Sequence, residues 1–403
     1  MTSSLRQSLS QSLKAVGAAI AVLISTLIFS PPAAAIVPAS GVHPREIVVG
    51  SLLDLSGPLS QEGIAIRNGL SMAFAEINKK GGINGRRLTL AVEDTAYDPA
   101  RAREAAKALL AKRVFAILCS NGTPPVTATM PMVLAQGVLH LFPFTSPDDT
   151  YVASQPLEFA IALPVAQQIR TGLNAILDMR GALKIGILYR GDAFGRAALA
   201  GTEDALAARK LQITAAESYA PGARDFAHEL LKLRRAGAEL VVIGAVAQET
   251  FAALKQAHAR GWYPVFLCPE ACYVPEVATL GGRAVSGLYA VATTPIPYPD
   301  AKDAALRDWV RNYESQFATV ASAQAFRAYL NARLFAEALR RSGPNPTQRH
   351  FARVLEAMPA WRDPQFGGVP VNYSADDHLG LQSGFLAQIR DGRWISLIPQ
   401  ARN

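Results

Sequence analysis

The chain has 403 residues, of which 50% are hydrophobic and 18% are charged, and it carries a formal net charge of +8. This hydrophobic content excludes a disordered chain, the three cysteines exclude a disulfide-rich scaffold, and the length allows two or three domains of about 100–200 residues. The basic residues form no single stripe, because Lys80, Arg235, Arg260 and Arg341 each stand one or two residues before a glycine at the expected end of a helix. A nucleic-acid surface is therefore not expected.

Residues 1–35 have the layout of a secretory signal peptide. Arg6 and Lys14 form a basic start, an apolar run covers residues 15–29, and three alanines ending at Ala35 supply the small residues of a cleavage site. The alternative is a membrane anchor, but the apolar run is shorter than the ~20 residues that a spanning helix needs. No cysteine stands at the junction, so a bacterial lipid anchor is not expected there. We expect cleavage after Ala35 and an exported chain.

Beyond the signal peptide, short apolar runs alternate with amphipathic segments. The amphipathic segments have the helical period, as in the stripe of Ile66, Leu70, Phe74 and Ile77. The apolar runs are rich in Val, Ile and Leu, which is typical of strands buried on both faces of a sheet. The expected strands cover residues 46–53, 88–93, 114–118, 138–142, 183–189, 212–218, 240–245, 264–268 and 287–291.

The alternation is interrupted twice. Residues 145–159 have the composition of a loop, after which a strand near Phe159 and a helix from Val165 restart the pattern. A Pro-rich connector at 294–299 precedes two long helices, at about 302–317 and 322–341, and residues 384–398 predict a hairpin with Asp391-Gly392 as its turn. Repeated strand–helix–strand segments imply parallel sheets covered by helices, here as two α/β halves with more than one connection.

Motifs for enzyme chemistry are missing from the sequence. It contains no G-x-S-x-G motif, no phosphate-binding loop and no G-x-G-x-x-G motif after a strand, and its six histidines are not paired at metal-ligand spacing. Cys119 and His140 remain an alternative pair of nucleophile and base, but no third group marks them as one. We therefore expect no enzyme, no cofactor and no metal.

Two neighbouring strand ends carry hydroxyl groups suited to a carboxylate. Ser120 and Thr123 follow the strand at 114–118, in a loop that opens a helix, and Thr123 is expected to cap that helix. A helix N-terminus at the carboxyl end of a parallel strand is an anion site. The next strand is followed by Pro143 and Thr145. The alternative for the first loop is a plain helix cap.

The second half of the chain offers an acid and a pair of cysteines. Glu270 follows the strand at 264–268 and is suited to pair with an ammonium group, the alternative being an exposed loop glutamate. Cys268 and Cys272 flank it, and we hypothesise that they form a disulfide. The alternative is that they are buried free thiols. Phe194 lies in another strand-to-helix turn.

Several motifs resemble the leucine/isoleucine/valine-binding protein family, the exported solute receptors of ATP-driven importers. The resemblance begins with Leu55-Ser56-Gly57-Pro58, the helix ending Ala75-Glu76-Ile77-Asn78, and Gly81-Gly82-Ile83-Asn84-Gly85-Arg86. It continues through Cys119-Ser120, Thr145-Ser146-Pro147, Asp192-Ala193-Phe194-Gly195 and Pro269-Glu270, and so covers nearly all of the chain after residue 35.

The resemblance implies an α/β fold of two doubly wound parallel-sheet lobes joined by three hinge crossovers, the type I periplasmic binding fold. It places the crossovers near Leu163, Val291 and Val369. The first lobe would then comprise residues 44–162 and 291–368, and the second lobe residues 163–290 and 369–403. Ligand would bind in the cleft between the lobes.

The resemblance also assigns site residues. Ser120 and Thr145 match residues that hold the α-carboxylate of an amino acid, the backbone of Pro143 helps to hold its ammonium, and Glu270 pairs with that ammonium from the second lobe.

The chain departs from this pattern at several site positions. Two cleft tyrosines correspond to Phe194 and to Val246 or Ala247, and Glu62 stands where an aromatic residue often contacts the ligand. Tyr97 replaces the cysteine that would pair with Cys119. These departures argue against a branched apolar amino acid.

Our interpretation is a periplasmic substrate-binding receptor of an ABC-type importer. It would be a monomer that closes its hinge on an amino acid or related small carboxylate, with the membrane permease subunits as partners. The alternative is a ligand-sensing receptor for an amide or an aromatic acid that feeds a signalling partner.

Overall fold

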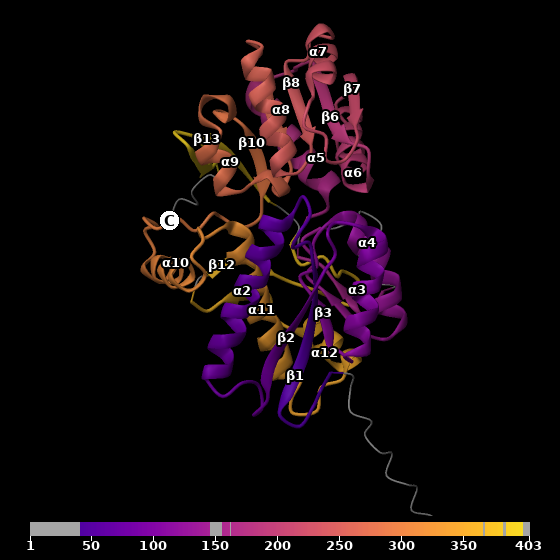
Figure 1. Ribbon diagram of the computed structural model, residues 1–403, viewed down its shortest axis with the longest axis vertical. Coiled ribbons are helices and arrows are strands. Elements are labelled where there is room, and N and C mark those ends of the chain that lie inside the picture. Colours follow the sequence, from indigo (N-terminus) through magenta and orange to yellow (C-terminus); the bar gives the residue numbers. More distant parts are fainter. Residues whose placement is uncertain (1–40, 146–154, 162, 366, 382–383, 398–403) are drawn as a thin grey trace, which may run out of the picture. The chain divides into compact units, whose positions relative to one another are not determined.

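The computed structural model describes residues 41–145, 155–161, 163–365, 367–381 and 384–397 (Figure 1). These residues belong to one compact unit, 39–403. The expected signal peptide and its cleavage site lie outside the described residues, as does most of the loop expected at 145–159. Within the described part of the chain, no helix is both long enough and apolar enough to cross a membrane.

The first sheet has five parallel strands in the order β2-β1-β3-β4-β5. The strands are β1 (Glu46–Leu53), β2 (Arg87–Asp94), β3 (Ala116–Leu118), β4 (Leu139–Leu141) and β5 (Glu158–Phe159). The helices between them are α2 (Ser60–Lys79), α3 (Pro99–Ala111) and α4 (Thr123–Ala135). Because these strands are parallel, the loops at the carboxyl ends of β1, β3 and β4 lie along one edge of the sheet.

The second sheet has seven strands in the order β14-β13-β10-β9-β8-β6-β7. Its parallel strands are β6 (Ile185–Arg190), β7 (Ile213–Tyr219), β8 (Leu240–Gly244), β9 (Val265–Cys268) and β10 (Tyr289–Ala292). The strands β13 (Phe385–Arg390) and β14 (Arg393–Ser396) form the antiparallel hairpin expected around Asp391-Gly392. The helices of this part are α5 (Val165–Arg180), α6 (Ala193–Ala207), α7 (Ala227–Arg235), α8 (Ala247–Ala259) and α9 (Pro275–Leu280).

The chain returns to the first sheet after β10. The helices α10 (Ala304–Phe317), α11 (Ala323–Arg341) and α12 (Gln348–Ala357) contribute to the hydrophobic core of the first sheet. Helix α11 lies along α2, where the two approach closely because Gly69 has no side chain: a Cβ there would lie 2.1 Å from the backbone oxygen of Ala325. A small hairpin follows, formed by β11 (Trp361–Asp363) and β12 (Gly367–Val371).

The boundary expected near Val369 does not coincide with the change of core. Val371, Tyr373 and Leu381 still pack in the core of the first sheet, and the chain rejoins the second sheet only at Phe385. Tyr373 packs against Phe142 and Phe159 of the first sheet. Among the described residues, Leu381 is the last that packs in the core of the first sheet.

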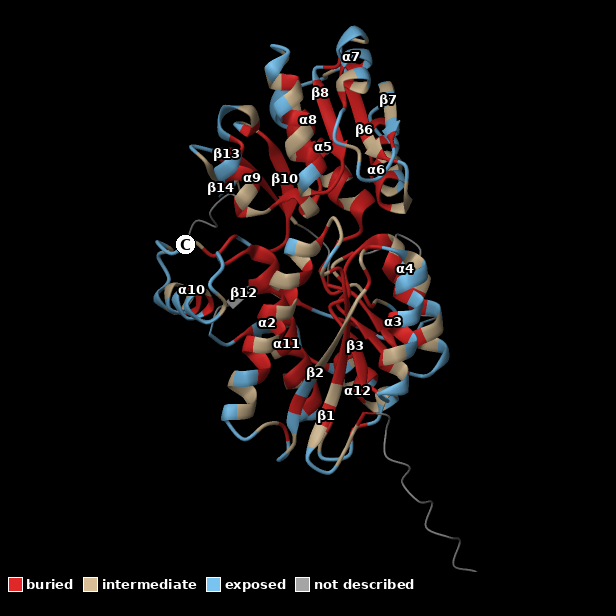
Figure 2. Ribbon diagram, viewed as in Figure 1, coloured by how far each residue is buried: buried red, intermediate tan, exposed pale blue. Residues whose placement is uncertain are grey.

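The expected strands all occur, with ends shifted by a few residues. The strands in the middle of each sheet are buried (Figure 2). The expectation of burial on both faces is wrong for β2 and β7. These are edge strands: β7 alternates between partly buried and exposed residues, and most residues of β2 are only partly buried, because an edge strand is covered by helices less completely than a central one. Helix α12 and the hairpin β11–β12 were not expected from the sequence.

Candidate functional site

The loops after β3 and β4 lie together at the edge of the first sheet. The backbone oxygen of Ser120 accepts a hydrogen bond from the N–H of Phe144 at 2.7 Å, and the hydroxyls of Thr123 and Thr145 are hydrogen-bonded to each other. The Ser120 side chain is only 1% exposed, and its Oγ has no hydrogen-bond partner among the described residues. The structure therefore brings Ser120, Thr123 and Thr145 together, with one buried hydroxyl unsatisfied.

Helix α4 begins differently from the expectation. Its N-cap is Gly122, with φ +87°, and no side chain caps it, so the expectation that Thr123 caps the helix is wrong. Thr123 is instead the first helical residue. Because Pro124 and Pro125 have no N–H, Thr123 is the only residue of the first three that can donate a backbone hydrogen bond. The uncapped N-terminus still presents the positive end of the helix dipole beside the hydroxyls.

Pro143 is buried in the loop between β4 and Thr145. Phe142 precedes it in a left-handed conformation, with φ +54°. Phe144 follows Pro143 and is partly buried. The Phe144–Ser120 hydrogen bond joins this loop to the loop after β3.

Tyr97 contacts residues from both parts of the chain. It packs with Leu59 and with Val246, the residue before α8, and its ring lies 4.9 Å from the guanidinium carbon of Arg190. Its hydroxyl is buried and has no partner among the described residues. Burial raises the pKa of Tyr97 above its ordinary value, so the phenol stays protonated. Ala247, the first residue of α8, is partly buried against the core of the second sheet.

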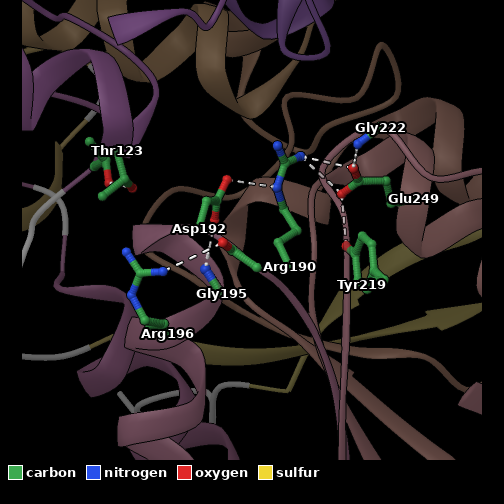
Figure 3. A network of polar contacts seen from close by, with 10 residues as sticks. Thr123, Arg190, Asp192, Gly195, Arg196, Tyr219, Gly222 and Glu249 are labelled. Carbon is green, nitrogen blue, oxygen red and sulfur yellow. Dashed lines mark hydrogen bonds and ion pairs between the residues drawn. The ribbon is translucent and has the colours of Figure 1, made fainter.

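Arg190, at the end of β6, is the centre of a buried polar network (Figure 3). It is 0% exposed, donates to Asp192 at 3.0 Å, and makes two hydrogen bonds to Glu249 at 2.9 and 3.0 Å. Glu249 also accepts from the Tyr219 hydroxyl at 2.8 Å and from the N–H of Gly222 at 2.9 Å. Burial and the nearby Glu249 carboxylate raise the pKa of Tyr219.

The same network fixes the turn that carries Phe194. Asp192 caps α6 by accepting from the N–H of Gly195 at 3.1 Å. Phe194 is 6% exposed and packs in the core of the second sheet. The structure therefore gives Phe194 extensive packing contacts. Arg190 and Glu249 were not identified from the sequence.

Glu270 is buried and already paired. Its backbone N–H donates to Gln168 Oε1 at 2.8 Å, and its Oε1 accepts from both the N–H and the hydroxyl of Thr293 at 2.8 Å. Its Oε2 forms an ion pair with Nη1 of Arg327, from α11. The alternative of an exposed loop glutamate does not hold, since Glu270 is only 6% exposed.

Arg327 is the partner that sequence reasoning missed. It is 5% exposed, donates to the Thr293 hydroxyl at 3.2 Å, and holds its guanidinium carbon 3.9 Å from the centre of the Phe144 ring. Arg327 therefore links two residues that follow strands of the second sheet, Glu270 and Thr293, to the loop after β4. Its only sequence signal was its position within a long, mostly apolar helix.

Glu62 lies in the first turn of α2, partly buried. Its Oε1 accepts from Asn121 Nδ2 at 3.1 Å. Burial raises the pKa of Glu62 to about 7, assisted by the negative charges of Glu270 and Asp54 and opposed by the Asn121 hydrogen bond and the positive charge of Arg327. A carboxyl group that changes charge near neutral pH therefore stands beside Asn121, the residue after Ser120.

The cysteines divide into a pair and a single thiol. A disulfide joins Cys268 to Cys272 around Glu270, and Cys119 is free and buried. Burial raises the pKa of Cys119 to about 12, and its Sγ contacts Asn331 Nδ2 at 3.6 Å. A thiol that stays protonated is a poor nucleophile. The alternative pair of Cys119 and His140 therefore gains no support.

A cavity of about 500 Å³ lies where the chain passes between the two sheets. This volume is within the range of small-molecule sites. Its lining includes Ile161, Thr293, Arg327, Leu330, Leu381 and Phe385. Arg327 therefore borders a mostly apolar cavity as well as Glu270. In the described residues, no group of three or more His, Cys, Asp or Glu side chains is placed to hold a metal ion.

The fold and this arrangement define a solute-binding protein, and comparison with known sequences agrees. The periplasmic binding protein family matches residues 46–393, and the chain belongs to this family. It is of the Leu/Ile/Val-binding type, and the family implies a periplasmic location.

Two curated relatives illustrate the similarity. The leucine-, isoleucine-, valine-, threonine- and alanine-binding protein of Pseudomonas aeruginosa is 29% identical over 259 residues, which cover 63% of this chain and 68% of that protein. The Leu/Ile/Val-binding protein of Escherichia coli K12 is 27% identical over 248 residues, which cover 60% of this chain and 66% of that protein, just under two thirds of its length.

Solved structures show the same fold. A substrate-binding periplasmic protein from Ralstonia solanacearum is 26% identical, with a TM-score of 0.77 over 87% of this chain and 99% of that one. A solute-binding protein of an ABC transporter from R. palustris, in complex with benzoate, is 18% identical, with a TM-score of 0.76 over 87% and 95%. A fatty acid ABC transporter substrate-binding protein from Thermomonospora curvata is 19% identical, with a TM-score of 0.78 over 89% and 93%. The expected fold class, the type I periplasmic binding fold, is confirmed.

Proposed function

We propose that the protein is the periplasmic receptor of an ABC-type importer and that it binds a small carboxylate through the loops after β3 and β4. The observation that carries this proposal is the buried, unsatisfied Oγ of Ser120, beside the Thr123–Thr145 pair and the uncapped start of α4. A buried hydroxyl without a partner is costly, and an anionic ligand would satisfy it.

The named relatives support the carboxylate. The curated relatives are named for amino acids, and the structural neighbours for benzoate and a fatty acid. These compounds differ in size, polarity and the presence of an amine, and they share a carboxylate. Relative to the family pattern, Ser120 and Thr145 are retained. Phe194 and either Val246 or Ala247 replace tyrosines. This is what a site would show if it kept its contacts with the carboxylate and changed its contacts with the rest of the ligand.

Function would follow from closure of two lobes on the ligand. We assign the first sheet with α2–α4 and α10–α12 to one lobe, and the second sheet with α5–α9 to the other. Two contacts already join the lobes: Tyr97 of the first lobe faces Arg190 of the second, and Arg327 of the first lobe pairs with Glu270 of the second. A ligand held by both lobes stabilises the closed form, which the membrane permease subunits would recognise in a monomeric receptor that carries out no reaction.

The experiment is a calorimetric titration with leucine, benzoate and octanoate, followed by Ser120→Ala and Thr145→Ala titrated with whichever of them binds. A hydrogen bond to a charged group is worth ~1.5–3 kcal/mol, so each variant should bind about ten- to a hundredfold more weakly. Ser396→Ala, an exposed hydroxyl on β14, is the control and should leave the affinity unchanged. Unchanged affinity in both site variants would refute the assignment of these loops.

A further inference from the structure

The carboxylate of Glu270 has little capacity left for a ligand. Its Oε1 accepts two hydrogen bonds from Thr293, and its Oε2 is paired with Arg327. A carboxylate offers about four acceptor positions, so three of them are already used. The negative charge is likewise balanced by one guanidinium within hydrogen-bonding contact.

The guanidinium of Arg327 is held in place from several sides. It contacts the Glu270 carboxylate, the Thr293 hydroxyl and the face of Phe144, and the residue is 5% exposed. Phe144 lies between Pro143 and Thr145, in the loop that the family resemblance assigns to the ligand's ammonium and carboxylate. A cation of the protein therefore already lies between this loop and Glu270.

A ligand ammonium at Glu270 would have to share the site with this cation. Two positive charges in a buried site repel each other strongly, because little water screens them. The ammonium could bind only if the Arg327 guanidinium moved away from Glu270, Thr293 and Phe144. The displaced guanidinium would then lose its ionic partner, Glu270.

We propose that the ligand of this receptor is a carboxylate that has no ammonium group, and that Arg327 determines this specificity by occupying the ammonium's place beside Glu270. The inference rests on the proposed carboxylate receptor function and narrows its ligand class.

Glu62 is the other acid that could receive an ammonium. It is hydrogen-bonded to Asn121, and burial raises its pKa to about 7. Near neutral pH the carboxyl is therefore partly protonated, which weakens its attraction for a cation. A neutral Glu62 is compatible with an anionic ligand nearby, since it removes a like charge.

The test uses three pairs of compounds that differ only by the α-amino group: 4-methylpentanoate and leucine, 3-phenylpropanoate and phenylalanine, and phenylacetate and phenylglycine. Calorimetry on the wild-type protein should show at least one amine-free acid binding tenfold or more tightly than its amino acid. Preference for the amino acid in the wild type would overturn the inference but leave the receptor function standing. If none of the six compounds bound, the proposed carboxylate function would fail and this inference with it.

Variants of Arg327 test its role. Arg327→Lys keeps the cation and should keep the preference, whereas Arg327→Met frees Glu270 and should reduce the preference at least tenfold or reverse it. Because Arg327→Met leaves a buried charge unpaired, Arg327→Met/Glu270→Gln provides a neutral, more stable background and should not gain amino-acid binding. An unchanged preference in Arg327→Met, or a gain of amino-acid binding in the double variant, would overturn the role of Arg327.

Discussion

The buried guanidinium of Arg190 makes two hydrogen bonds to the carboxylate of Glu249, which lies 59 positions later in the chain. Asp192 and Tyr219 complete the network, which joins the end of β6, the starts of α6 and α8, and the neighbouring edge strand β7. The same arginine faces the Tyr97 ring from the first sheet's loops. The network therefore supports the part of the second sheet that lies nearest the proposed site.

Removing Glu249 should destabilise the protein strongly. In Glu249→Ala, Arg190 keeps only Asp192 as an ionic partner and remains buried, and breaking a buried pair typically costs about 3–5 kcal/mol. Urea unfolding measures the difference. Glu203→Ala, at an exposed position on α6, is the matched control. A loss of less than about 1 kcal/mol in Glu249→Ala, the range of surface pairs, would contradict the importance of the network.

Glu62 should make the stability depend on pH. Its folded-state pKa of about 7 lies above the ordinary value of 4.5, so the folded protein holds this proton more tightly than the unfolded chain does. The contribution of Glu62 to the free energy of unfolding is therefore full below about pH 4.5 and decreases as the pH rises to about 7.

Glu62→Gln, which can still accept from Asn121, should match the wild type at pH 4 and exceed it at pH 8. We expect a gain of about 1–2 kcal/mol at pH 8, less than the full pKa shift implies because the side chain is partly exposed. Chemical denaturation at both pH values checks this, with the exposed Glu104→Gln as control. A gain of equal size at both pH values would contradict the raised pKa.

Tyr97→Phe should stabilise the ligand-free protein and weaken ligand binding. The hydroxyl of Tyr97 is buried without a partner, so its removal relieves a cost of about 1 kcal/mol while the ring stays over Arg190. Thermal unfolding and calorimetry with the best-binding carboxylate measure the two effects. Tyr273→Phe is the control: its hydroxyl accepts from the N–H of Ile296 at 3.3 Å, so its loss should destabilise. A destabilised Tyr97→Phe with normal affinity would contradict both expectations.

Thiol titration of the unreduced, denatured protein should find one free thiol per chain, that of Cys119. After reduction it should find three, because Cys268 and Cys272 are joined in the native protein. The Cys119→Ser variant should give none before reduction. Three thiols in the unreduced wild type would show that the bond around Glu270 does not form.

Local sequence patterns predicted most of the fold. The apolar strands from Glu46 onward, the helical stripe from Ile66 to Ile77 and the Asp391-Gly392 turn each depend on neighbouring residues, and each occurs where expected. The hairpin β11–β12 was missed because it has only short strands and is held by packing against the first core. The exposure of β2 and β7 depends on strand order, which the sequence does not specify locally.

The polar contacts of the site were harder to predict from the sequence. Arg327 lies 57 positions from Glu270, and no periodicity links an arginine on a long helix to an acid in a distant loop. Thr123 was expected to cap α4, but Gly122 takes that position, with a backbone conformation that glycine adopts readily. The hydroxyls of Thr123 and Thr145 lie together because the adjacent parallel strands β3 and β4 end at one edge of the sheet.

The most direct test of the receptor function is a calorimetric titration of the purified protein with the amine-free acids and amino acids named above, followed by recovery of the bound compound. We predict that one carboxylate binds with one equivalent per chain and is recovered chemically unchanged. Chemical conversion of the compound, or the absence of binding by every carboxylate tested, would contradict the account.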